Sequence, residues 1–143
     1  MIMAGIVELH VPALPEYLQM VRSVVGAAAS TGANLKPERV ADLRLAVSEA
    51  TTNAMEAHGL SGLEDRVTVR CDLSASRIEV EVADCGPGFD PNSLPSLPDV
   101  NSPDRLRHES GLGVSLMHHL TDETIVESHD DGTAVRLIVH FGD

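Results

Sequence analysis

A glutamate and an asparagine at helical spacing are the first candidates for chemistry in this chain. Glu49 and Asn53 are four residues apart, so on a helix they project from one face, about 40° apart around its axis. Glu56 falls on the same side, and this polar stripe is roughly 120° from the centre of the apolar stripe of the same helix. A glutamate at the rim of a pocket can polarise a hydroxyl or a water, and an asparagine oxygen can ligate Mg²⁺. A solvated helix face has the same pattern, so the spacing alone leaves both interpretations open.

The segment Asp84-Cys85-Gly86-Pro87-Gly88 follows directly after a predicted strand. Its two glycines allow backbone conformations that other residues avoid, and they permit a ligand to approach closely. An aspartate at the end of a strand can accept a hydrogen bond from an exocyclic amine. The same residue types also favour a simple turn, which is the alternative interpretation.

A second glycine motif, Ser-Gly-Leu-Gly at residues 110–113, opens a predicted helix. Backbone N–H groups at a helix N-terminus form an anion site, and glycines let a phosphate come close. A small basic cluster precedes this motif in an otherwise acidic chain, and it consists of Arg105, Arg107 and His108. Arginine suits bidentate contact with phosphate. The alternative is a flexible hinge with two arginines on the surface.

The composition excludes several other nucleotide-binding motifs. The single lysine, Lys36, precedes a proline and lies near no glycine motif. A P-loop needs a lysine after its glycines, and protein kinases with a Gly-rich loop need a strand lysine. No Gly-x-Gly-x-x-Gly follows the first predicted strand, so a Rossmann site is not supported. His118 and His119 are adjacent, so on a helix they diverge by about 100° and do not suit one metal ion.

The predicted elements run in the order strand, helix, helix, hairpin, lid, helix, hairpin. Their ranges are a strand at 6–11, helices that begin at Pro15 and Pro37, strands at 67–73 and 78–82, a helix at 111–120, and strands at 124–128 and 133–139. Residues 85–110 hold five prolines and few apolar residues, which predicts a functional lid at about 89–110. We expect a single domain, residues 1–143, of the α+β class: a two-layer sandwich with a mixed, mostly antiparallel sheet and three helices on one face.

The charge and composition narrow the possible partners. The net charge of −12 argues against direct binding to nucleic acid or to anionic lipid, and it means that a bound ATP would need Mg²⁺ and locally positive groups. Aromatic residues make up only 2% of the chain, so the core must be aliphatic. We found no membrane-spanning run or signal peptide. Because Cys71 and Cys85 are isolated, we expect reduced thiols in a cytoplasmic protein.

Four motifs taken together resemble the GHKL ATP-binding fold (gyrase, Hsp90, histidine kinase, MutL). They are Glu-Ala-Thr-Thr-Asn-Ala at 49–54, similar to the N box; Asp-Cys-Gly-Pro-Gly-Phe-Asp-Pro at 84–91, similar to the first glycine box; Ser-Gly-Leu-Gly-Val at 110–114, similar to the second; and Gly-Thr-Ala-Val at 132–135, similar to the terminal strand. Their order and spacing resemble those of the bacterial anti-sigma-factor serine kinases over nearly the whole chain. Many members carry a histidine four residues after the N-box asparagine, whereas this chain has Ala57 there and His58 one residue later.

This resemblance implies ATP and Mg²⁺ as ligands and a role for each matching residue. Glu49 would be the general base for a substrate serine, and Asn53 would hold the Mg²⁺ that bridges the phosphates. Asp84 would bond the adenine amino group, supported by Thr133. The other implied nucleotide contacts come from Gly86 and Gly88 beneath the nucleotide and from Gly111, Leu112 and Gly113 around the phosphates. We add Arg105 as a candidate phosphate contact.

The leading hypothesis is an anti-sigma factor that is also a serine kinase. By resemblance, it would sequester a sigma factor and phosphorylate a serine on an antagonist protein of the STAS type, and by analogy alone we expect a homodimer. The main alternative is a nucleotide-sensing module that binds ATP·Mg²⁺ without kinase activity, and Glu49 argues against it because pure binding does not need a base. A histidine-kinase catalytic domain would need an added phosphoacceptor domain, and a scaffold that binds no nucleotide is the remaining alternative.

Overall fold

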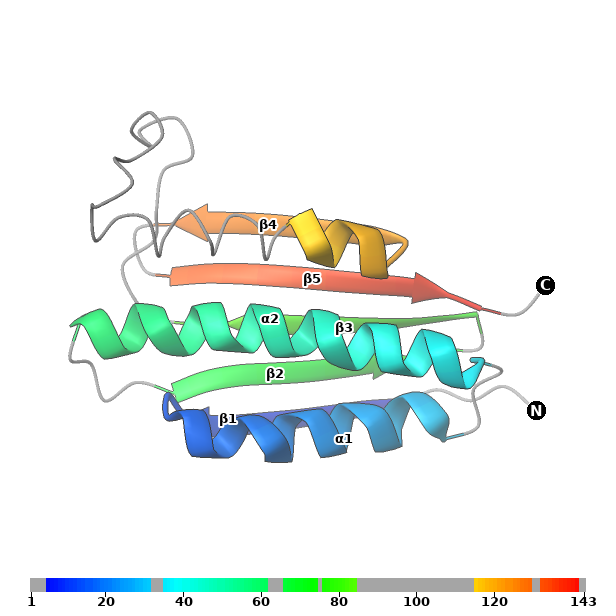
Figure 1. Cartoon of the computed structure of the whole chain (residues 1–143), viewed down its shortest axis with the longest axis horizontal. Helices are drawn as coiled ribbons and strands as arrows, with labels where there is room; N and C mark the ends of the chain where they lie inside the picture. The colour runs from blue at the N-terminus through cyan, green and yellow to red at the C-terminus, as the bar shows by residue number, and fades with distance from the viewer. Residues whose placement is uncertain are drawn as a thin grey trace.

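The protein has two layers, a five-stranded sheet and a set of helices that all cover one face of it (Figure 1). This computed structural model describes residues 5–31, 35–61, 66–74, 76–84, 115–129 and 132–141. The elements are β1 (Gly5–Pro12), the 3₁₀ turn η1 (Pro15–Tyr17), α1 (Leu18–Ser30), α2 (Pro37–Ser61), β2 (Arg66–Leu73), β3 (Arg77–Ala83), β4 (Glu123–His129) and β5 (Gly132–His140). Residues 115–120 are also helical.

The sequence periodicity predicted these elements to within one or two residues at the described ends. The two proline starts are confirmed, because η1 begins at Pro15 and α2 at Pro37. The predicted third helix is confirmed over 115–120, and its first residues lie outside the described part of the chain. The lid predicted at about 89–110 lies entirely outside it.

The longest helix, α2, packs through one apolar stripe. Leu43, Val47, Ala50 and Ala54 are all buried, and their spacing of three and four residues places them on one side of the helix. This side packs against β2, β3 and β5. The neighbouring flank packs against α1, where Arg44 lies over Gly26 so closely that a Cβ on that glycine would come within 2.9 Å of the Arg44 Cδ.

The sheet has the strand order β1-β2-β3-β5-β4, and each described strand pair is antiparallel. The mostly antiparallel α+β sandwich predicted from the sequence is therefore confirmed. Strand β5 lies between β3 and β4, with Val82 opposite Val135 and Ala83 opposite Ala134. Because of this insertion, the end of β3 lies beside the beginning of β5, which are about fifty residues apart in sequence.

The core is aliphatic, as the scarcity of aromatic residues predicted. Alternate residues of the central strands are buried, among them Val69, Val80, Val82 and Leu137. Cys71 is a free thiol in this core, and its burial raises its pKa from 9.0 to about 11. Cys85 lies outside the described residues. Within the described ranges, no helix is both long enough and apolar enough to cross a membrane.

Candidate functional site

The second half of α2 carries the two polar side chains predicted to face a ligand. Glu49 and Asn53 are both half-buried, and within the described chain neither side chain forms a hydrogen bond or an ion pair with another residue. The side of α2 that carries these two residues can be located from Arg39, which forms an ion pair with Asp122. Asp122 comes just after helix 115–120, and this helix lies on the opposite side of α2 from α1 (Figure 1). Arg39 and Asn53 are fourteen residues apart, nearly four turns, so they lie about 40° apart around the helix axis. Asn53 therefore lies on the flank of α2 away from α1.

A second pair of predicted site residues meets at the edge of the β3–β5 ladder. The backbone N–H of Asp84, directly after β3, donates to the carbonyl oxygen of Thr133 at 2.9 Å. The hydroxyl of Thr133 in turn lies 3.3 Å from that of Ser128 on β4. Asp84 and Thr133 are both half-buried. The sequence resemblance paired these two residues at one site, and the structure brings them into direct contact.

The Asp84–Thr133 pair lies at the end of the molecule toward which α2 runs. Figure 1 shows α2 and β3 ending, and β5 beginning, at the left of the view. Asp84 and Thr133 therefore lie at the end of the sandwich toward which α2 runs, while Glu49 is at the midpoint of α2 and Asn53 lies one turn closer to that end. The other predicted nucleotide contacts are outside the described residues, namely Gly86, Gly88, Arg105, Gly111, Leu112 and Gly113.

The described part of this site is acidic. Glu49 and Asp84 are its charged groups, and in the described ranges no arginine or lysine forms an ion pair with Glu49. A triphosphate placed here would be repelled unless cations neutralised it, which fits a ligand that arrives with Mg²⁺. Among the described residues no group of three His, Cys, Asp or Glu side chains forms a metal site, so a metal here would depend on oxygens such as that of Asn53 and of the ligand itself.

Sequence reasoning missed a polar contact that fixes the helix beside Glu49. The Nε of Arg22 on α1 donates to the Ser48 hydroxyl at 2.6 Å, and Ser48 donates to the carbonyl oxygen of Arg44 at 2.8 Å. Ser48 is buried, so this bond satisfies a polar group that would otherwise be costly. A serine on the α1-facing side of α2 was the one available signal, but its partner comes from another helix.

The nearby Thr51 was also not anticipated. Its side chain is fully buried, and within the described structure its hydroxyl has no hydrogen-bond partner. Buried hydroxyls are usually paired, often with the carbonyl one turn earlier. An unpaired buried hydroxyl here is expected to cost stability directly next to the candidate site.

Comparison with known proteins provides independent evidence on the family and the fold of this chain. The model of the histidine kinase-like ATPase domain family matches residues 11–139. The chain is 36% identical over 134 residues to the serine-protein kinase RsbW of Bacillus subtilis (strain 168), an alignment that covers 91% of this chain and 82% of that protein. It is 35% identical over 134 residues to RsbW of Bacillus pumilus (strain SAFR-032), with coverage of 90% and 82%.

Two solved structures share the fold. The first contains the RsbU and RsbW domains of a Mycobacterium tuberculosis protein, with a TM-score of 0.69, 18% identity, and coverage of 94% of this chain and 32% of that chain. The second is the SiaB–SiaC complex of Pseudomonas aeruginosa, with a TM-score of 0.61, 13% identity, and coverage of 93% and 88%. The resemblance that the four motifs indicated is thus confirmed: this chain belongs to the histidine kinase-like ATPase domain family and, within it, to the RsbW serine-protein kinases.

Proposed function

We propose that this protein is an ATP·Mg²⁺-dependent serine kinase and anti-sigma factor whose substrate is a serine on a STAS-type antagonist protein. Family membership supports the kinase class, because relatives named serine-protein kinases align over about four-fifths of their length. The observation that supports the residue roles is the contact between Asp84 and Thr133 at the β3–β5 end, toward which the flank of α2 with Glu49 and Asn53 runs. Binding to a sigma factor and a cytoplasmic location belong to the same proposal.

The four described site residues divide into two functional pairs. Asp84 accepts a hydrogen bond from the adenine amino group, and Thr133 holds Asp84 in place through its carbonyl oxygen. Asn53 contributes an oxygen ligand to Mg²⁺, which neutralises charge on the phosphates when it is bound. Glu49 accepts the proton of the substrate serine. Each group is half-buried, a setting in which directed polar contacts are stronger than in water.

The chemical step is an in-line displacement. The serine Oγ forms a bond to the γ-phosphorus, the bond from that phosphorus to the β–γ bridging oxygen breaks, and ADP leaves with the electron pair. The serine proton passes to Glu49. Most of the rate enhancement comes from positioning and charge neutralisation rather than from covalent chemistry. The family motifs imply phosphate contacts from Gly111, Leu112 and Gly113 and a floor of the nucleotide site from Gly86 and Gly88, and we add Arg105 as a further phosphate contact.

A phosphate-transfer assay with labelled ATP, Mg²⁺ and candidate STAS-type antagonists tests the proposal. We expect Glu49→Gln to lower the transfer rate by about 100-fold or more, because a general base contributes 10²–10⁴-fold, while ATP affinity stays within about two-fold. The matched control is Asp42→Asn, which neutralises another half-buried acid of α2, two turns before Glu49, and should transfer at the wild-type rate.

The other outcomes separate the alternatives. Equal transfer by wild type and Glu49→Gln would exclude Glu49 as the base. ATP binding without transfer to any antagonist would make the protein a nucleotide-sensing module. Absence of heat on titration with ATP and Mg²⁺ would overturn the nucleotide site itself.

A further inference from the structure

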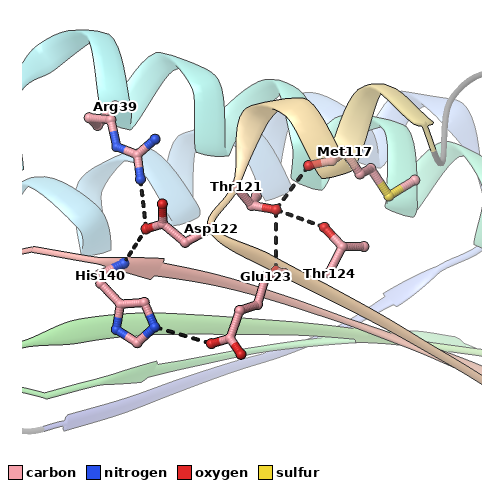
Figure 2. A network of polar contacts seen from close by, with 7 residues as sticks. All are labelled: Arg39, Met117, Thr121, Asp122, Glu123, Thr124 and His140. Carbon is pink, nitrogen blue, oxygen red and sulfur yellow. Dashed lines mark hydrogen bonds and ion pairs between the residues drawn. The ribbon is translucent and has the colours of Figure 1, made fainter.

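A single aspartate ties three elements together at the end of the molecule opposite the candidate site. One carboxylate oxygen of Asp122, Oδ2, accepts from the Nη2 of Arg39 at 2.8 Å and from the backbone N–H of His140 at 2.7 Å (Figure 2). Arg39 lies in the first turn of α2, and His140 is the last residue of β5. We call Arg39, Asp122 and the His140 N–H the Asp122 junction.

Further hydrogen bonds hold Asp122 and the residue before it in place. Asp122 donates its backbone N–H to the carbonyl oxygen of Ile138 at 2.9 Å. The preceding residue, Thr121, is buried, and its hydroxyl and backbone N–H lie 2.9 and 3.2 Å from the carbonyl oxygen of Met117. Its hydroxyl also lies 2.7 Å from that of Thr124. Because the Met117 side chain is fully buried in the core and the Asp122 backbone bonds to β5, Asp122 is held by the sheet and the core independently of Arg39.

The contact with Arg39 therefore fixes the start of α2 against β5. The flank of α2 that carries Arg39 also carries Asn53, about 21 Å further along the axis at 1.5 Å per residue. A change of about 3° in helix tilt shifts points this far apart by about 1 Å relative to each other, and misplacement of that size can cost up to 10²-fold in a positioned reaction. The angle of α2 thus controls the distance between its polar flank and the Asp84–Thr133 pair on the sheet.

We propose that Arg39 and Asp122 are positioning residues for the nucleotide site, which set the spacing between the α2 flank and the β3–β5 end of the sheet. This inference rests on the proposed function of that site. A ligand that reaches both parts, ATP·Mg²⁺, depends on the spacing, whereas adenosine uses the sheet part alone. Stability depends on the pair only weakly, because both side chains are about one-third exposed and water screens the attraction between exposed charges.

Calorimetric titration of the full chain with ATP·Mg²⁺ and with adenosine tests this inference. We expect Arg39→Gln and Asp122→Asn each to weaken ATP·Mg²⁺ binding by about 2–5-fold and to leave adenosine binding unchanged. Asp122→Asn retains a carbonyl oxygen for the His140 N–H, so it removes mainly the ion pair. Arg39→Lys should keep most of the wild-type affinity, and the double variant should be no weaker than either single one, because both changes break the same contact.

A matched control comes from another half-exposed arginine. Arg136 pairs with Glu127 at 3.2 Å on the face of the sheet away from the helices, and Arg136→Gln should leave both ligands bound as in wild type. Wild-type affinity in the Arg39 and Asp122 variants, or equal weakening of adenosine and ATP·Mg²⁺, would overturn the inference. A wild-type protein that binds ATP·Mg²⁺ but phosphorylates nothing would refute only the kinase proposal, whereas one that binds no ATP would refute both.

Discussion

The two ends of α2 use polar side chains in opposite ways. At its start, Arg39 is bonded to Asp122, whose carboxylate is shared with the end of β5. In its second half, Glu49 and Asn53 are half-buried, yet in the described chain they pair with no other residue. Half-buried polar groups without a protein partner remain available to water or to a ligand. The difference is consistent with a structural role for the first end and with the ligand role that we propose for Glu49 and Asn53.

The largest expected effect concerns the structural end. Leu43, in the first half of α2, is fully buried, so Leu43→Ala should lower the free energy of unfolding by about 2–5 kcal/mol through lost burial and a residual cavity. Urea unfolding followed by circular dichroism measures this loss. The matched control is Leu45→Ala, two residues further on, where the side chain is 43% exposed and the loss should be below about 1 kcal/mol. Equal losses of stability in the two variants would contradict the conclusion that the buried side of the first half of α2 stabilises the fold.

The next effect concerns the ligand end. Asp84→Asn should weaken ATP·Mg²⁺ binding by about 10–100-fold, because a hydrogen bond to a charged group contributes about 1.5–3 kcal/mol, while the melting temperature changes little. Calorimetric titration measures the affinity. Asp72→Asn is the control, since Asp72 is a half-buried acid of the neighbouring strand β2 that faces Glu79 across the ladder. If both substitutions weaken binding alike, the effect is one of net charge and not of the adenine contact.

The smallest effect compares two buried hydroxyls. The Thr51 hydroxyl has no partner in the described structure, so Thr51→Val should stabilise the protein by about 1 kcal/mol by removing an unsatisfied polar group. The Thr121 hydroxyl has partners in Met117 and Thr124, so Thr121→Val should destabilise it by about 1–2 kcal/mol. Thermal unfolding of the two variants should therefore shift in opposite directions. A Thr51→Val variant that melts below wild type would indicate that its hydroxyl is bonded in solution.

Local patterns were sufficient to predict most of the secondary structure. The alternation of residues 78–82 and the three-and-four spacing from Leu43 to Ala54 each follow from the geometry of a single element, so neither needs knowledge of the rest of the chain. The family motifs also predicted that Asp84 and Thr133 lie together, and the two are in backbone contact; their binding of a nucleotide stays a prediction. The phosphate contacts predicted at Gly111, Leu112, Gly113 and Arg105 stay predictions.

The sequence by itself determined the elements, the α+β class, the aliphatic core and the four motifs that define the family, because these depend on residue type and short spacing. Only the tertiary structure decided that β5 lies between β3 and β4, which brings Thr133 to Asp84. It also decided that Arg39 meets Asp122, 83 residues away, and that Thr51 is buried without a partner. These contacts depend on the order of the strands and on how α2 lies on the sheet, which involve residues far apart in the sequence and therefore follow from no local pattern.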